Sequence, residues 1–170
     1  MKITLVNPPY PPSVHSHPPF IPLGIAYLGA VAEKAGHEVT VIDCQAEKLT
    51  YDLFRSRIGQ KPADIIGVTS TTLLYKSAMQ LINIAKEVQP NAVTILGGSH
   101  GTFWDENALN EYPTLDIVVR REGTEIGTSR VFVVESGAPV AGDTTVHLVG
   151  DERPQFLVPM GSLLKAESPL

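Results

Sequence analysis

Two short polar segments contain the residue types best suited to hold a ligand. In "VTSTT", residues 68–72, four hydroxyl side chains follow an apolar run, and hydroxyls in such a place bond a ligand or cap the next helix. In "ILGGSHG", residues 95–101, Gly97 and Gly98 lack a Cβ, so a ligand can approach the backbone closely or φ can turn positive. Each segment alone is as typical of a strand-to-helix turn as of a binding site, and we expect Thr71 or Thr72 to be the helix N-cap.

A third segment, "VNPPYPPSVHSHPPF" at residues 6–20, contains six prolines and two histidines. His15 and His17 are two residues apart, a spacing that a metal ion could bridge, but closed zinc sites use four protein ligands and catalytic ones three. No cysteine or carboxylate lies within this segment. We therefore predict neither a metal site nor a catalytic residue. The lone cysteine, Cys44, also excludes an internal disulfide and any cysteine-rich metal or iron–sulfur motif.

Three familiar nucleotide and phosphate motifs are missing from the sequence. A dinucleotide-binding fold places G-x-G-x-x-G after its first strand, where this chain has "NPPY". The P-loop pattern G-x-x-x-x-G-K-[ST] occurs nowhere, and a receiver domain needs an acidic residue where Ser70 stands. NAD and phosphate-loop functions are therefore disfavoured. Asp43, at the end of a β-branched run, either touches a ligand or caps the next segment.

The composition is that of a globular protein that does not bind nucleic acid. Of 170 residues, 43% are hydrophobic and 18% are charged, and the net charge of −5 comes without any basic cluster longer than Arg120 and Arg121. No apolar run reaches the roughly 20 residues that a membrane span needs, and the first residues lack a signal-peptide cleavage pattern. We expect one domain with an appendage, located in the cytoplasm and without a membrane span.

Alternating strand-like and helix-like segments predict an α/β fold. Apolar, β-branched runs predict strands at 2–7, 38–43, 64–70, 92–98 and 115–120, and the gaps between them predict helices over 23–35, 49–58, 73–89 and 102–112. Continuously apolar strands joined by helices imply a parallel sheet with right-handed crossovers. We predict a Rossmann-like, doubly wound, five-stranded sheet of flavodoxin-like order 2-1-3-4-5. The helix over 23–35 is apolar or small nearly all round, which predicts that it is buried on all sides.

The predicted strand order brings the three polar segments together. The first, third and fourth strands end beside the topological switch point, where open α/β sheets bind their ligands. The polar segments follow these three strands directly, so they should converge on one crevice at the carboxyl edge of the sheet. The predicted ligand site therefore combines the segments that begin at Asn7, Ser70 and Gly97.

The chain after residue 121 has a different character. Two strand-like runs, "RVFVV" (130–134) and "TVHLV" (145–149), are separated by "ESGAPVAGDT". This arrangement predicts a β-hairpin with a long loop that either extends the sheet or lies outside it. We accordingly divide the chain into a ligand-binding domain, 1–121, and a tail, 122–170.

Five segments, taken in order, resemble a known family. The segments "NPP", "PLGIAYLGAVAEKAGHEVTVID", "PADIIGVTSTT", "ILGGSHGT" and "DIVVRREG" are similar to the N-terminal cobalamin-binding domain of the B12-dependent radical SAM enzymes. In that family the domain is Rossmann-like and holds a corrinoid at the carboxyl ends of its strands. A following radical SAM barrel uses the corrinoid for methyl transfer to unreactive carbon or phosphorus. In the chlorophyll branch the reaction is the oxidative ring closure of a magnesium porphyrin ester.

The resemblance implies a corrinoid site at the predicted carboxyl edge. The proline-rich loop that begins at Asn7 and Pro8 would lie near the corrin ring, stiffened by the fixed φ of its prolines. The cobalt-ligating D-x-H-x-x-G pattern of methionine-synthase-like domains is missing, so His15 and His17 are kept only as candidate cobalt ligands. The residues that would line the pocket for the nucleotide tail are Ser70, Thr71, Thr72, Gly97, Gly98, Ser99 and His100. A bulky residue at Gly98 is expected to block corrinoid uptake and to leave the fold largely intact.

One departure from the family limits what this chain does by itself. The radical SAM [4Fe–4S] cluster needs three cysteines in C-x-x-x-C-x-x-C, and this chain has one. We therefore expect a corrinoid carrier whose parent enzyme also uses S-adenosylmethionine and a [4Fe–4S] cluster, both bound by a radical SAM catalytic domain outside this chain. Two alternatives stay open. One is a flavodoxin-like module for a flavin or nucleotide, and the other is a non-catalytic interaction domain that self-associates through an exposed edge of the tail.

Overall fold

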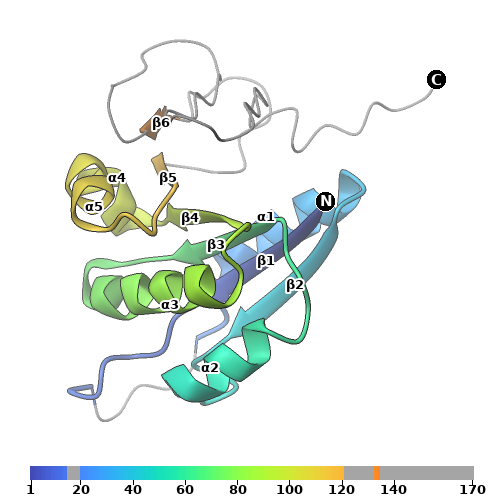
Figure 1. The fold of residues 1–170 in the computed structure, drawn as a ribbon, viewed down its shortest axis with the longest axis horizontal. Coiled ribbons are helices and arrows are strands. Elements are labelled where there is room, and N and C mark those ends of the chain that lie inside the picture. Colours follow the sequence, from blue (N-terminus) through green and yellow to red (C-terminus); the bar gives the residue numbers. More distant parts are fainter. Residues whose placement is uncertain (15–19, 121–131, 135–170) are drawn as a thin grey trace.

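The computed structural model describes residues 1–14, 20–120 and 132–134 of the chain (Figure 1). Within these ranges, strands and helices alternate along the sequence as predicted. The strands are β1 (Lys2–Asn7), β2 (Glu38–Asp43), β3 (Ile65–Thr69), β4 (Val93–Gly97), β5 (Ile117–Arg120) and β6 (Phe132–Val134). The helices are α1 (Leu23–Lys34), α2 (Tyr51–Ile58), the short 3-10 helix η1 (Thr72–Leu74), α3 (Tyr75–Val88), α4 (Ser99–Phe103) and α5 (Asp105–Glu111).

The strands form one sheet in the order β2-β1-β3-β4-β5-β6. The first five strands of the chain are parallel to one another, and this confirms the predicted doubly wound fold of order 2-1-3-4-5. β6 pairs antiparallel with β5, so the first predicted strand of the tail extends the sheet. The second, at 145–149, lies outside the described residues, and the domain boundary after residue 121 stays a prediction.

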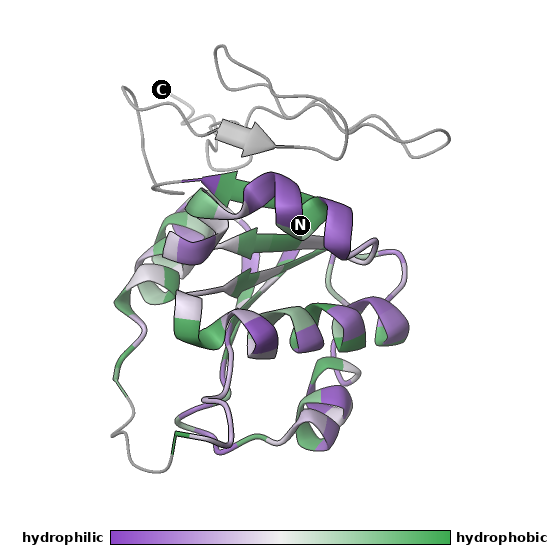
Figure 2. Ribbon diagram, turned by 90° about the vertical axis from the view of Figure 1, so that its left-hand side faces the viewer, coloured by the Kyte–Doolittle hydropathy of each residue, from purple (hydrophilic) through white to green (hydrophobic). Residues whose placement is uncertain are grey.

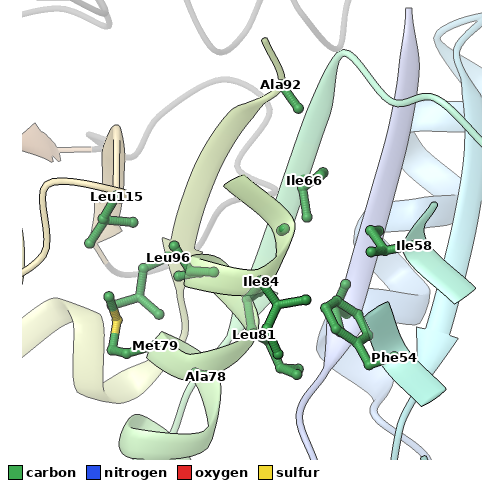
Figure 3. Close-up of a cluster of buried hydrophobic side chains, with 14 of the residues drawn as sticks. Phe54, Ile58, Ile66, Ala78, Met79, Leu81, Ile84, Ala92, Leu96 and Leu115 are labelled. Carbon is green, nitrogen blue, oxygen red and sulfur yellow. The ribbon is translucent and has the colours of Figure 1, made fainter. Parts of the chain in front are cut away.

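The two faces of the sheet carry cores of unequal size. On one face, α2, α3 and α5 pack over a large apolar cluster that includes the fully buried Phe54 and Leu96 (Figure 3). Among the described helices, α1 alone covers the other face, over a small cluster that includes Ile3, Leu5 and Ile25. Figures 1 and 2 show α1 and α3 on opposite sides of the sheet. The α1 face therefore has the thinner apolar layer.

The prediction that α1 is buried on all sides is wrong. Its inward residues Ile25, Gly29 and Ala32 are buried, and Gly29 lies close to side chains of β1 and β2. On the opposite side, Leu23 and Tyr27 are exposed. The physical reason is that no element of the described chain packs outside α1, so the helix contacts the sheet through one side only.

The predicted helix over 102–112 forms two helices instead of one. α4 and α5 are separated at Trp104, whose φ of −127° and ψ of 25° depart from helical geometry. α4 begins directly after Gly98, so His100 lies in a helix and not in a loop. α2 begins after Thr50, whose hydroxyl accepts a hydrogen bond from the Leu53 backbone N at 3.3 Å, which is a typical N-cap.

A largely buried ion pair connects α3 to the amino ends of β4 and β5. Lys86 Nζ donates to the Asp116 carboxylate, and it also donates to the Ala92 carbonyl oxygen at 2.8 Å. The same carboxylate accepts from the backbone N and the hydroxyl of Thr94, at 2.8 and 2.9 Å. Burial raises the pKa of Asp116, but the hydrogen bonds from Lys86 and Thr94 outweigh it, so this pKa lies below its ordinary value.

Replacing Asp116 with Asn is expected to cost about 3 kcal/mol of folding free energy, because it leaves the Lys86 charge buried without its partner. The folded-state pKa of Asp116 is lowered, so its contribution is present above the unfolded pKa and is lost as the pH falls through the folded value. In urea titrations followed by circular dichroism, the gap between wild type and Asp116→Asn should be widest near neutral pH and should narrow below about pH 4.

The matched control is Glu87→Gln, which removes one partner of the exposed Arg55–Glu87 pair. Exposed ion pairs contribute little, so this change should cost less than about 1 kcal/mol at any pH. Equal losses from the two substitutions at neutral pH would show that the Lys86–Asp116 pair does not fasten α3 to the sheet.

Candidate functional site

The loops after β3 and β4 meet at the carboxyl edge of the sheet. The Ser70 backbone N donates to the Gly97 carbonyl oxygen at 2.9 Å, and the His100 backbone N donates to the Ser70 carbonyl oxygen at 3.1 Å. His100 Nδ1 also lies 3.2 Å from the Thr72 hydroxyl oxygen. These contacts join two of the predicted segments into one polar surface beside the topological switch point of the sheet.

Gly98 is required where the two loops touch. Its φ of +89° lies in the left-handed region, and a Cβ there would stand 2.5 Å from the Ser70 carbonyl oxygen and 2.8 Å from the Ser70 backbone N. Both are backbone atoms that bond the neighbouring loop, so neither can move away cheaply. The expectation that a bulky residue at Gly98 leaves the fold intact is therefore wrong.

Gly97, in contrast, faces open space. No heavy atom lies within 4 Å of the position that its Cβ would take. Gly97 pairs with Thr69, and one step back along the same face Ile95 pairs with Gly67. A Cβ at Gly67 would meet Leu5 of the small cluster under α1, so this is the face that α1 covers in part. The sheet surface beside α1 is thus poor in side chains near the carboxyl edge.

The three hydroxyl residues after β3 have different surroundings. Ser70 is fully buried, and its Oγ donates to the Thr71 carbonyl oxygen at 3.0 Å, so it supports the loop from within. Thr71 is exposed and precedes η1 without bonding it through its side chain. Thr72 is exposed, and its hydroxyl contacts His100. Thr71 is the N-cap residue of η1, as expected, but its hydroxyl does not bond the helix. Thr71 and the exposed Ser99 therefore present hydroxyls at the surface of this edge.

His100 lies between two aromatic rings. Its ring centroid is 4.3 Å from that of Tyr75 and 6.3 Å from that of Trp104. Burial lowers the pKa of His100 below its ordinary value, so the imidazole is neutral at pH 7. A neutral imidazole with Nδ1 at the Thr72 hydroxyl can offer a ligand one hydrogen bond through Nε2, without a charge.

The start of the proline-rich loop is fastened to the end of β2. Asn7 Nδ2 donates to Asp43 Oδ1 at 2.9 Å, and the same oxygen accepts from the Gln45 backbone N at 3.0 Å. The Pro8 carbonyl oxygen accepts from Gln45 Nε2 at 2.9 Å. Of the two roles left open for Asp43, the structure therefore shows the capping one. Asn7 and Pro8 are buried here, and their assignment to cofactor binding stays a prediction.

Sequence reasoning misses the aromatic residues around His100. Tyr75 begins α3, its ring packs edge-on against Tyr112 with centroids 6.2 Å apart, and its buried hydroxyl has no hydrogen-bond partner among the described residues. Burial raises the pKa of Tyr75 to about 12, so the phenol stays protonated. The one available signal is the four-residue spacing of His100 and Trp104, which places both side chains on one side of a helical turn.

The described residues include no evident metal site. His15 and His17 lie outside them, so their role as candidate cobalt ligands stays a prediction. Within 1–14, 20–120 and 132–134, no three His, Cys, Asp or Glu side chains gather as metal ligands would. Cys44 is buried, and burial raises its pKa to about 12, so its thiol is not a reactive thiolate. In the same part of the chain, no helix combines the length and hydrophobicity of a membrane span.

The fold and its carboxyl edge define the class of protein. A doubly wound parallel sheet with small and polar residues at its switch point is a Rossmann-like ligand-binding domain. Residues 14–129 match the sequence model of the B12 binding domain. The chain belongs to the B12-binding domain family, as the resemblance implied.

Similar proteins of known sequence are much longer than this chain. It is 35% identical over 127 residues to the anaerobic magnesium-protoporphyrin IX monomethyl ester cyclase of Rubrivivax gelatinosus, a match that covers 74% of this chain and 23% of the cyclase. It is 35% identical over 147 residues to an uncharacterized methyltransferase of Pyrococcus horikoshii, covering 84% of this chain and 31% of that protein. The chain thus spans less than a third of the length of these relatives.

Two solved structures share the fold. The radical S-adenosylmethionine methyltransferase TsrM from Kitasatospora setae, solved with cobalamin and a [4Fe-4S] cluster, aligns with a TM-score of 0.59 at 18% identity over 69% of this chain and 23% of its own. The cobalamin-dependent S-adenosylmethionine radical enzyme OxsB aligns with a TM-score of 0.58 at 21% identity, over 72% of this chain and 17% of its own. Both alignments show a shared fold.

Gly98→Ala is expected to destabilise the chain by about 2–4 kcal/mol, because the new Cβ meets backbone atoms and φ is positive. Gly97→Ala should change stability by less than about 1 kcal/mol, because its Cβ enters open space. Urea titrations of the two variants, followed by circular dichroism, measure the difference. A stable Gly98→Ala protein would mean that the β3 and β4 loops are not held as described.

Proposed function

We propose that this chain binds cobalamin at the carboxyl edge of its sheet and is the corrinoid-binding part of a longer radical SAM enzyme. The observation that supports the site most directly is the contrast between its two glycines. Gly98 locks the loops together, whereas Gly97 leaves the surface of β4 open. Glycine within a strand is typical of places where a ligand approaches the backbone closely, and membership of the B12-binding domain family supports cobalamin as that ligand.

The residues around Gly97 suit the polar tail of cobalamin. A planar base can lie against the bare backbone of β4, and the exposed hydroxyls of Thr71 and Ser99 can bond ribose or phosphate oxygens. His100 offers Nε2 as an uncharged partner, held in place by Tyr75 and the Thr72 hydroxyl. Ser70, being fully buried, acts in this proposal by supporting the loop and not by touching the ligand. When bound, cobalamin supplies a cobalt centre that carries a methyl group or an electron.

We further propose that the reaction itself takes place in a radical SAM catalytic domain outside this chain, which binds S-adenosylmethionine and a [4Fe–4S] cluster. The support is the single cysteine of this sequence together with relatives several times its length, among them a cyclase and methyltransferases. The parent reaction is then methyl transfer or a related radical reaction such as ring closure. One cysteine without a disulfide partner also suits a reducing, cytoplasmic location.

The purified chain, incubated with hydroxocobalamin and passed over a desalting column, is expected to retain about one equivalent of corrinoid, as a single open edge implies. A visible absorption spectrum measures the retained corrinoid and reports its axial ligands. Gly97→Val should reduce the retained amount at least about tenfold, because the side chain fills the open position against β4. The matched control, Gln80→Val on the exposed side of α3, should retain as much as wild type.

Circular dichroism of Gly97→Val separates a blocked site from a lost fold. Full retention by a folded Gly97→Val protein would overturn the placement of the site. A wild-type chain that binds flavin mononucleotide and no corrinoid would favour the flavodoxin-like alternative instead.

A further inference from the structure

The outward side of α1 and the residues just before it form an apolar surface. Ile21 is 78% exposed, Leu23 is 73% exposed and Tyr27 is 63% exposed. Leu23 and Tyr27 are four residues apart and so lie on the same side of the helix. Ala26 and Ala30, which are also exposed, place small apolar residues beside them. We call this the α1 outer surface.

The outward sides of α3 and α5 are polar, whereas the remaining described helices apart from α1 carry single exposed apolar residues, Leu53 on α2, Leu73 on η1 and Phe103 on α4. The exposed residues of α3 are Lys76, Gln80 and Glu87, and those of α5 are Glu106, Asn107, Asn110 and Glu111. Figure 2 shows the same contrast, with α3 and α5 carrying purple, hydrophilic turns where α1 is mainly green or white. Single exposed apolar residues are ordinary on protein surfaces, whereas a contiguous apolar patch marks an interaction site.

The α1 outer surface belongs to the face of the sheet with the smaller core. On that face the side chains of Val93 and Ile95 on β4 are only half-buried, because α1 lies over β1 and β2. The opposite face is closed by α2, α3 and α5 over a much larger cluster. Within the described residues, three helices therefore cover one face of the sheet over a large core. The other face is covered by α1 alone, and the outer side of α1 is apolar.

The α1 outer surface is also continuous with the proposed cofactor edge. Ile21 and Leu23 follow the loop that leaves the carboxyl end of β1, and Tyr27 extends the patch along α1 away from that edge. A partner domain that reaches a corrinoid at this edge can therefore also contact the α1 outer surface. Self-association with a second copy of the chain does not require a contact surface beside the cofactor edge.

We propose that the α1 outer surface is the docking surface for the catalytic domain with which this module works. The inference rests on the proposed function and deepens it by naming where the partner sits. The occupant is apolar where it meets Leu23 and Tyr27, and it belongs to the part of the longer relatives that this chain does not match, since the chain spans 23% of one and 31% of the other. Aromatic anchors such as Tyr27 are typical of interface centres.

Thiol labelling tests this surface, because the chain contains one cysteine and it is buried. Leu23→Cys and Tyr27→Cys place a reactive thiol on the α1 outer surface, and Gln80→Cys places the control thiol on the polar side of α3. Each variant is made in the 170-residue chain and in a fusion where this chain replaces the matched part of the Rubrivivax gelatinosus cyclase. Fusion keeps the effective concentration of the two bodies in the millimolar range.

The rate of alkylation by iodoacetamide is expected to fall at least about tenfold at positions 23 and 27 in the fusion, as for a surface covered about 90% of the time. The rate at position 80 should not change. A second fusion, to the unmatched part of the Pyrococcus horikoshii methyltransferase, gives an independent partner. Equal rates with and without the partner in both fusions would overturn the proposal.

Two further results separate this proposal from others. Hydroxocobalamin retention is measured on the same fusions. Retained corrinoid without protection of positions 23 and 27 from alkylation overturns the docking surface alone. Protection of these positions without retained corrinoid overturns the proposed function and supports the docking surface. Protection of the unfused chain that grows with its own concentration would assign the surface to a second copy and overturn the catalytic-domain assignment.

Discussion

The backbone hydrogen bonds between the loops after β3 and β4 determine the arrangement of the whole carboxyl edge. Ser70 donates to Gly97 and accepts from His100, which draws the two loops so close that only a glycine fits at position 98. Once the loops are joined, α4 must begin at Ser99, and the His100 ring is brought against Tyr75 at the start of α3.

Three ionisable groups at or near this edge, His100, Tyr75 and Cys44, are uncharged at neutral pH. The His100 pKa is lowered by burial, and the Tyr75 and Cys44 pKa values are both raised to about 12. The Cys44 thiol and the Tyr75 phenol therefore stay protonated at pH 7, and the His100 imidazole is neutral.

Helices cover the two faces of the sheet to different extents. A doubly wound sheet needs apolar layers on both faces, and in the described chain one face has a large core and the other has α1 alone. The polar network of Lys86, Asp116 and Thr94 lies at the amino edge of the sheet, away from the proposed cofactor site.

The sequence by itself determined the strands, their parallel order and the three loops that approach one edge, because these follow from local hydrophobic period and from the handedness of crossovers. It did not reveal that Gly98 is structural and Gly97 is open, since both glycines look alike until their neighbours in space are known. The apolar composition of α1 also predicted burial on all sides, but whether its outer side is exposed depends on which elements pack outside it. Only the tertiary structure decides such questions, because they concern contacts between residues far apart in the chain.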